Sequence, residues 1–226
     1  MSRPEAAAVL RAAEEYAQRE LGGDGSGHDW WHVHRVRNLA VALAHEEGAD
    51  PFITELAALL HDIADFKLSG SLTAGAEAAR TFCRAQRLVE TEVEHVADIV
   101  ATLSFKGAGV PDPEMSLEGR CVRDADRLDA LGAIGIGRAF AYGGRVGRPM
   151  WDPSTEPELH ATEDAYRSNR GTTINHFHEK LLVLKGRMTT ASGRRRAEHR
   201  HTVVQSFLQE FMSEWDGKDG INRDGK

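Results

Sequence analysis

A histidine and an aspartate, His61 and Asp62, stand side by side in an apolar stretch of the chain that begins near Ile53. Asp65 follows three residues after Asp62 and four after His61, so on a helix the three polar side chains would share one side. Burying an imidazole and two carboxylates without partners is costly, and a divalent cation removes that cost because both groups bind it. The alternative is a helix end with a few solvated polar residues, and the pair alone does not decide between the two.

Two other predicted helices carry candidate ligands. His32 lies one turn before Val36, at the N-terminal end of the apolar stripe of a helix expected from about residue 29 to residue 47. Taken by itself, His32 fits a core histidine bonded to a backbone carbonyl better than a ligand. An acidic cluster occupies a helix expected over residues 118–141, where Asp126 and Asp129 share a face. Ion pairs with neighbouring arginines would explain part of that cluster.

Composition restricts the class of protein. The chain has 226 residues, enough for one sizeable domain, and a formal net charge of -7 that disfavours nonspecific binding to nucleic acid. Its two cysteines, Cys83 and Cys121, are too few for a disulfide framework or a zinc thiolate cluster. No signal-peptide core is present, and no uncharged apolar run approaches the roughly 20 residues of a membrane helix. We therefore expect a cytoplasmic protein that binds neither nucleic acid nor membrane.

Apolar residues recur at helical spacing along most of the chain, and no segment alternates as a strand would. Asp50 followed by Pro51 is a strong helix start. The segment from Tyr142 to Thr173 is the least regular, and such long segments are usually functional or mobile. These patterns predict an all-α, single-domain helical bundle over residues 1–215 and a disordered tail over residues 216–226.

The order of the candidate ligands resembles that of the HD-domain superfamily of metal-dependent phosphohydrolases. The resemblance has four parts in chain order: His32-Val33-His34-Arg35-Val36, Leu59-Leu60-His61-Asp62-Ile63, residues 124–135, and His176-Phe177-His178-Glu179-Lys180-Leu181-Leu182. The first is similar to the opening motif His-x-x-Arg-Val, and the second contains the pair that names the superfamily. The last two are similar to motifs of one small bacterial branch. Together the four parts cover nearly the whole chain, from about residue 28 to residue 215.

The resemblance implies that His32, His61, Asp62 and Asp126 bind a divalent metal ion. Two imidazoles and two carboxylates favour Mn²⁺, with Fe²⁺, Co²⁺ or Ni²⁺ as alternatives, and disfavour Mg²⁺, which prefers oxygen ligands. Such an ion would polarise a phosphoryl oxygen and lower the pKa of a bound water. Asp65 is the candidate to orient or deprotonate that water, and its alternative role is to hold His61 in one tautomer.

Basic residues near these motifs are candidates for binding the substrate phosphate. Arg35, Lys67 and Arg127 could grip phosphate charge, although each could instead form a surface ion pair. His176 and Lys180 belong to the branch-specific motif, so we expect them in the substrate pocket. The divalent metal ion is predicted to be the cofactor. The expected partner is a small phosphorylated molecule.

Three functions fit this resemblance. Some members of the branch are nucleotide pyrophosphohydrolases, which implies a nucleoside triphosphate split to monophosphate and pyrophosphate. The first alternative is a phosphomonoesterase acting on nucleotides or small phosphorylated metabolites. The second is a non-catalytic module that binds a metal or another ligand, which the intact ligand positions argue against. The oligomeric state is left open by the sequence.

The number of metal ions can be predicted from an absence of histidines. Many HD hydrolases carry extra histidines between the pair and the final aspartate, and some use them for a second metal. Here the helix expected over residues 93–105 offers only His95, while Asp98 and Leu103 stand where branch relatives place histidines. We predict one tightly bound divalent ion per chain, to be measured by elemental analysis of the purified protein. Two tightly bound ions per chain would contradict this prediction.

Overall fold

The computed structural model describes residues 3–22, 29–63 and 73–219. Every regular element in these residues is helical, which confirms the all-α prediction. Two predicted site residues, Asp65 and Lys67, lie outside the described residues, so their roles stay predictions. The last described residues continue beyond the final helix as a turn, in which Lys218 N donates to the carbonyl of Ser213.

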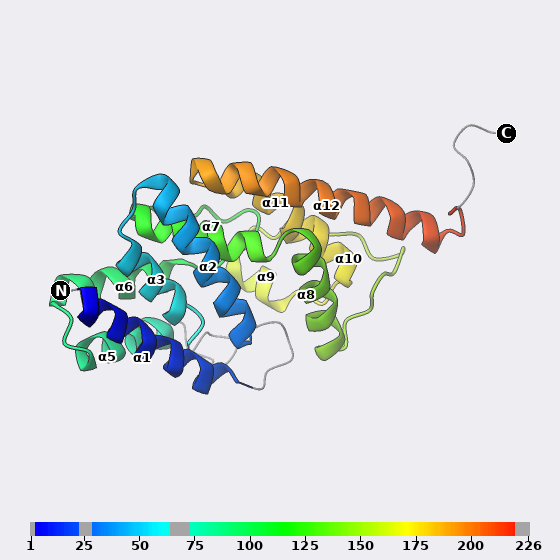
Figure 1. The fold of residues 1–226 in the computed structure, drawn as a ribbon. Coiled ribbons are helices and arrows are strands. Elements are labelled where there is room, and N and C mark those ends of the chain that lie inside the picture. Colours follow the sequence, from blue (N-terminus) through cyan, green and yellow to red (C-terminus); the bar gives the residue numbers. More distant parts are fainter. Residues whose placement is uncertain (1–2, 23–28, 64–72, 220–226) are drawn as a thin grey trace.

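The helices form one bundle in which α12 runs along one side and α1 along the opposite side (Figure 1). In chain order the elements are α1 (Arg3–Leu21), α2 (Trp30–Glu47), α3 (Pro51–Leu60), α5 (Ala74–Ala85), α6 (Glu90–Thr102), α7 (Leu117–Asp129), α8 (Gly132–Arg145), α9 (Glu163–Ser168), α10 (Thr173–His176), the π-helix η1 (Phe177–Leu181), α11 (Leu182–Leu184), the 3₁₀-helix η2 (Lys185–Arg187) and α12 (Ala191–Trp215).

Helix α2 packs against α3 and α7, and these three helices carry the predicted metal ligands. Asp29 caps α2, because its side chain accepts the backbone N–H of His32 at 3.0 Å. Gly48 ends the helix with a left-handed backbone, φ 78°, that glycine adopts without steric cost. Asp50 then accepts the N–H groups of Phe52 and Ile53 and starts α3. The local signals at these ends therefore determine where α2 and α3 meet.

Helix α3 ends earlier than the apolar pattern indicates. Its last helical residue is Leu60, and His61 is the C-cap. His61, Asp62 and Ile63 form a turn, with Ile63 N bonded to the carbonyl of Leu60. The histidine and aspartate therefore lie at the end of a helix and not within it. Since helix ends leave backbone groups unpaired, the His61 side chain can reach the carbonyl of Ala58 there.

The expected helix over residues 118–141 is divided in two. Helix α7 ends at Asp129, and Gly132 starts α8 with a positive φ of 72°. A Cβ on Gly135 would lie 2.2 Å from the carbonyl oxygen of Ala130, so the turn closes tightly only because that position has no side chain. The prediction of one continuous helix was wrong, because helical periodicity persists across this turn.

The irregular segment that begins at Tyr142 is shorter than expected. Helix α8 runs on to Arg145, and Glu163 to Ser168 form α9. The remainder is attached to the bundle by backbone hydrogen bonds, in which Thr173 N and Ile174 N donate to the carbonyls of Pro149 and Met150. This segment is therefore part of the body of the domain.

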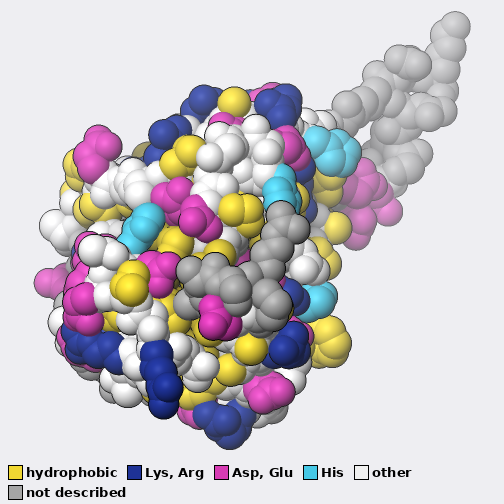
Figure 2. Space-filling model, turned by 60° about the vertical axis from the view of Figure 1, so that its left-hand side comes forward, with side chains coloured by type: hydrophobic (Ala, Val, Ile, Leu, Met, Phe, Trp, Pro, Cys, Tyr) yellow, Lys and Arg dark blue, Asp and Glu magenta, His cyan; other side chains and the backbone are white. Residues whose placement is uncertain are grey.

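The described surface is mixed in charge. On the face shown in Figure 2, basic, acidic and hydrophobic side chains are interspersed. Among the helices that the structure describes, none is both long and apolar enough to cross a membrane.

The turn between α7 and α8 makes a matched pair of glycine substitutions informative. Gly135→Ala should lower the free energy of unfolding by about 1–3 kcal/mol, because the added methyl group overlaps the carbonyl of Ala130. Gly137→Ala, in the same helix with nothing within 4 Å of the added atom, should be neutral or stabilising by up to about 1 kcal/mol. Urea-induced unfolding measures both, and equal stabilities of the two variants would contradict the prediction.

Candidate metal centre

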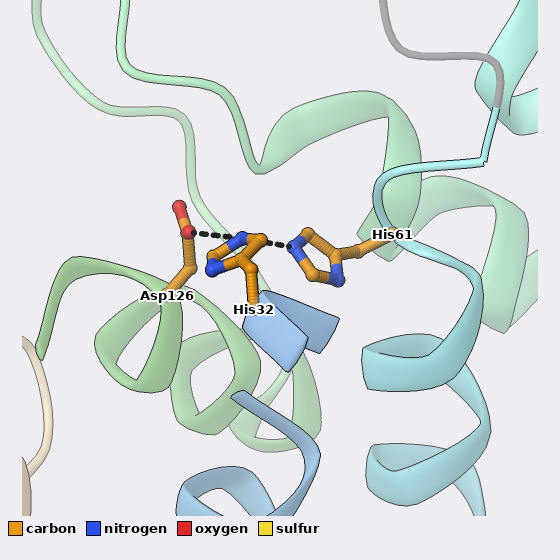
Figure 3. Close-up of side chains that lie close together, drawn as sticks. All are labelled: His32, His61 and Asp126. Atoms are coloured by element: carbon orange, nitrogen blue, oxygen red, sulfur yellow. Dashed lines mark hydrogen bonds and ion pairs between the residues drawn. The ribbon is translucent and has the colours of Figure 1, made fainter. Parts of the chain in front are cut away.

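The structure brings together histidines and an aspartate from three helices (Figure 3). His32 comes from the first turn of α2, His61 from the end of α3, and Asp126 from α7. The two Nε2 atoms lie 3.2 Å apart, and Asp126 Oδ1 lies 3.5 Å from His32 Nε2. One donor atom from each residue lies within 4.8 Å of the others, which is close enough to hold a metal ion.

Asp62 closes this group from a further side. Its Oδ2 lies 3.3 Å from His32 Nε2, and its Oδ1 lies 3.6 Å from His61 Nε2. The side chains of His32 and Asp62 are almost fully buried, whereas one third of the Asp126 side chain is exposed. The four residues that the sequence predicts as ligands therefore face one another, with Asp126 open to solvent.

Each imidazole carries its proton on Nδ1, the ring nitrogen that faces away from this centre. His61 Nδ1 lies 2.7 Å from the carbonyl oxygen of Ala58, which can only accept, so Nδ1 carries the proton. His32 Nδ1 likewise donates to Asp129 Oδ2 at 2.8 Å. In the neutral tautomers each Nε2 is then a lone pair directed at the other Nε2 and at the two carboxylates.

Such a group of acceptors requires positive charge between its members. Two lone pairs 3.2 Å apart repel each other, and buried carboxylates add to the repulsion. Burial lowers the pKa of His32, but its hydrogen bonds with Asp129 and Asp62 outweigh that effect and raise the pKa above its usual value. A divalent cation meets the same need, and the nitrogen and oxygen donors fit a transition metal. The residues present therefore suit a metal ion.

Asp126 remains ionised in this setting. Burial raises the pKa of its carboxyl, whereas the nearby His32 and His61 lower it, and the balance leaves the pKa below its usual value. A carboxylate that keeps its charge while partly open to solvent can bind a cation and also contact water. Asp126 thus links the buried ligands to the solvent-exposed side of the centre.

Asp129 supports the centre from behind His32. Arg35 Nε and Nη2 donate to its two oxygens at 2.7 and 3.0 Å, and Arg138 Nη1 lies 3.0 Å from Oδ2. Burial raises the pKa of Asp129, but its bonds with His32 and Arg35 hold this pKa well below its usual range. An ionised Asp129 holds the ring of His32 in one tautomer and orientation. The sequence places Asp129 on the same face as Asp126 but does not indicate this role.

A cavity of about 430 Å³ opens beside the ligands, within the usual size of small-molecule sites. Its lining includes His61, Asp62 and Asp126, so a molecule bound there would touch the centre. Apolar residues form part of the remaining lining. Positive or polar side chains from the C-terminal half of the chain also line the cavity: Arg127, Arg138, Tyr142, Arg148, Tyr166, Asn169, His176 and Lys180.

The predicted substrate residues divide into two groups. Lys180 and His176 line the cavity, and the ammonium of Lys180 lies 5.5 Å from the centre of the Phe105 ring. Burial lowers the pKa of Lys180, and Asp126 partly opposes this shift. Arg127 also lines the cavity, but its guanidinium donates to both oxygens of Asp112.

Arg35 lies outside the cavity lining, and its guanidinium is engaged with Asp129. Arg148, Tyr166 and Asn169 were not predicted individually, because they come from the irregular segment and carry no motif. The length of that segment was the only signal in the sequence that pointed to a functional role. Phosphate contacts by the predicted residues stay predictions.

Comparison with known proteins identifies the class. The HD-domain family model matches residues 30–131, a range that holds all four candidate ligands and ends just before α8. A crystal structure of a protein from Lactobacillus plantarum superposes with a TM-score of 0.84 at 38% identity, covering 93% of this chain and 98% of that one. A structure described as an HD-superfamily hydrolase, from Bacillus thuringiensis, has a TM-score of 0.72 at 41% identity with the same coverage.

The protein YpgQ of Bacillus subtilis is also similar over nearly its full length. Its sequence is 35% identical over 214 residues, which cover 93% of this chain and 97% of YpgQ. Its crystal structure in complex with ADP has a TM-score of 0.73, covering 93% of this chain and 100% of that one. This chain belongs to the HD-domain superfamily, among relatives described as hydrolases, and its histidine–aspartate cluster is able to hold the metal ion of such a domain.

The contact between Asp129 and His32 predicts an effect on metal binding. Asp129→Asn removes the charge that holds the Nδ1 proton of His32, so the affinity for Mn²⁺ should fall about 10–100-fold. Competition with a chromophoric chelator measures this affinity. Asp98→Asn, the same change at an exposed position of α6, is the control and should leave it unchanged. An Asp129→Asn protein that binds Mn²⁺ as tightly as the wild type would contradict the role of Asp129.

Proposed function

We propose that this protein is a phosphohydrolase that splits a nucleoside triphosphate into a monophosphate and pyrophosphate, with one divalent cation, Mn²⁺ first among the candidates, held by His32, His61, Asp62 and Asp126. The observation that carries the proposal is the position of this group in the wall of a cavity that is also lined by basic side chains. Ligands for a cation and groups that bind phosphate thus face the same space. A module that only held a structural metal would not need both.

The lining supports a phosphorylated substrate. Arg138, Arg148 and Lys180 place positive charge along the cavity, and phosphoryl transfer depends on such charge to stabilise the reacting phosphate. Burial favours the neutral form of Lys180, whereas Asp126 favours its charged form. A bound phosphate adds negative charge and would favour the ammonium further, so Lys180 can bind phosphate as a cation.

Aromatic side chains and a relative support a nucleotide. Tyr142, Phe105 and Tyr166 line the same cavity, and aromatic rings are the side chains on which nucleotide bases stack. The relative YpgQ was crystallised with ADP. A phosphate-binding cavity with aromatic walls fits the same ligand class.

The residues of the chain have distinct tasks in this proposal. The Nδ1 protons of His32 and His61 keep the rings turned toward the cation site. A bound cation would act as a Lewis acid toward the phosphate and lower the pKa of water. Asp126, ionised and partly exposed, can accept a hydrogen bond from a water in the cavity. Asp65, outside the described residues, remains a candidate base or a partner of His61.

Turnover assays test the proposal directly. Purified protein with Mn²⁺ and a panel of nucleoside triphosphates should release pyrophosphate, and His61→Ala or Asp126→Asn should lower the rate at least about 100-fold, because each removes a ligand. Asp98→Asn is the control for a carboxylate change on the surface. Release of phosphate from nucleoside monophosphates, with no pyrophosphate from any triphosphate, would favour a phosphomonoesterase. Release of neither from any nucleotide or general phosphoester would contradict a phosphohydrolase.

A further inference from the structure

The π-helix η1 contains a buried carboxylate that the proposed reaction does not use. Glu179 is 2% exposed. In the sequence it lies between His176 and Lys180, two residues of the branch-specific motif that line the cavity. A buried carboxylate is costly unless hydrogen bonds compensate it, and π-turns occur frequently at functional sites. The position of Glu179 therefore needs an explanation.

Two hydrogen bonds connect Glu179 to the irregular segment. Asn169 Nδ2 donates to Oε2 at 2.5 Å, and the backbone N–H of Glu158 donates to Oε1 at 3.1 Å. The buried His160 lies close by, with Nε2 3.9 Å from Oε2. One carboxylate thus holds two points of the chain that are eleven residues apart.

Asn169 connects Glu179 to the lining of the cavity. Its side-chain oxygen accepts the N–H of Gly171 at 2.7 Å, and its backbone carbonyl lies 3.4 Å from Nη2 of Arg148. Both Asn169 and Arg148 line the cavity. A contact chain therefore runs from the buried carboxylate to a guanidinium beside the substrate space.

The same segment also supplies an aromatic wall. Tyr166, which lines the cavity, lies between other rings, with its centroid 6.0 Å from that of His160 and 6.5 Å from that of His176. Its ring also contacts Phe105 edge-on at 5.3 Å. His160 and Asn169 flank Tyr166 in the chain and both lie beside the Glu179 carboxylate, so this ring belongs to the same contact network.

We propose that Glu179 is a positioning residue for substrate binding, which holds residues 158–171 so that Arg148, Tyr166 and Asn169 face the cavity. This inference rests on the proposed function and deepens it. Glu179 touches no ligand of the cation site and acts through its neighbours. Residues 149–155 have other anchors, since Pro149 and Met150 accept backbone bonds from α10, so the loss of Glu179 should move one wall of the cavity without unfolding the domain.

Substitutions at Glu179 and Asn169 separate positioning from mere stability. Glu179→Gln keeps the volume but offers one acceptor where two donors arrive, so one hydrogen bond is lost. The double variant Asn169→Asp, Glu179→Gln reverses the donor and the acceptor, keeps the total charge, and allows both bonds to form again. Glu156→Gln is the matched control, because it makes the same change at an exposed position of the same segment.

The readouts are the Kd for ADP, by calorimetry with Mn²⁺ present, and the affinity for Mn²⁺ alone. Glu179→Gln should bind ADP about tenfold more weakly, as expected when a hydrogen bond to a charged group is lost, with Mn²⁺ affinity unchanged. The double variant should return to within about threefold of the wild type. Glu156→Gln should match the wild type in both measurements.

Three results would overturn the inference. They are ADP binding by Glu179→Gln as tight as that of the wild type, an equal loss of Mn²⁺ affinity, and a double variant no better than Glu179→Gln. A wild-type protein that binds ADP but hydrolyses no nucleotide would refute the proposed reaction alone. A wild-type protein that does not bind ADP would refute this inference, whereas the proposed reaction is decided by pyrophosphate release from the panel of triphosphates.

Discussion

The bond between Asp129 and His32 Nδ1 is the contact on which the centre depends. In the neutral form of the fully buried His32 ring, this bond keeps the single proton on Nδ1. The Nε2 lone pair is then directed toward His61, Asp62 and Asp126. Asp129 can do this only because Arg35 and Arg138 compensate its buried charge. The resulting group of acceptors requires positive charge between its members, and the cluster is able to hold a metal ion that would supply it.

The three aspartates of α7 show how neighbouring residues of one type take different roles. Asp124 is buried and accepts the backbone N–H groups of Thr189 and Thr190, which attaches the start of α12 to α7. Asp126 faces the cavity, and Asp129 faces α2. Asp126 and Asp129, three residues apart on the helix, both approach the ring of His32, whereas Asp124 points to the start of α12. One helix therefore borders the cavity, contacts the candidate ligand His32 and packs against α12.

The cavity is assembled from two parts of the chain. The ligands come from α2, α3 and α7, inside the HD-domain match, whereas Arg138, Arg148, Tyr166 and Lys180 come from residues beyond it. In this arrangement the first part provides cation chemistry that a whole superfamily can share. In the proposed function, the second part, including the irregular segment and η1, would surround the remainder of the substrate, and differences there would change which phosphorylated molecule fits.

The sequence by itself determined the all-α class, the starts of α2 and α3, and the four candidate ligands, because caps, helical periodicity and short motifs are local in the chain. It did not determine that α3 ends before His61 or that α7 and α8 are separate helices, since the apolar pattern continues across both turns. Only the tertiary structure could show that Arg35 donates to Asp129, that Asp129 contacts His32 Nδ1, and that Glu179 accepts a hydrogen bond from Asn169. These are contacts between side chains far apart in the chain, and their partners are decided by how whole helices pack.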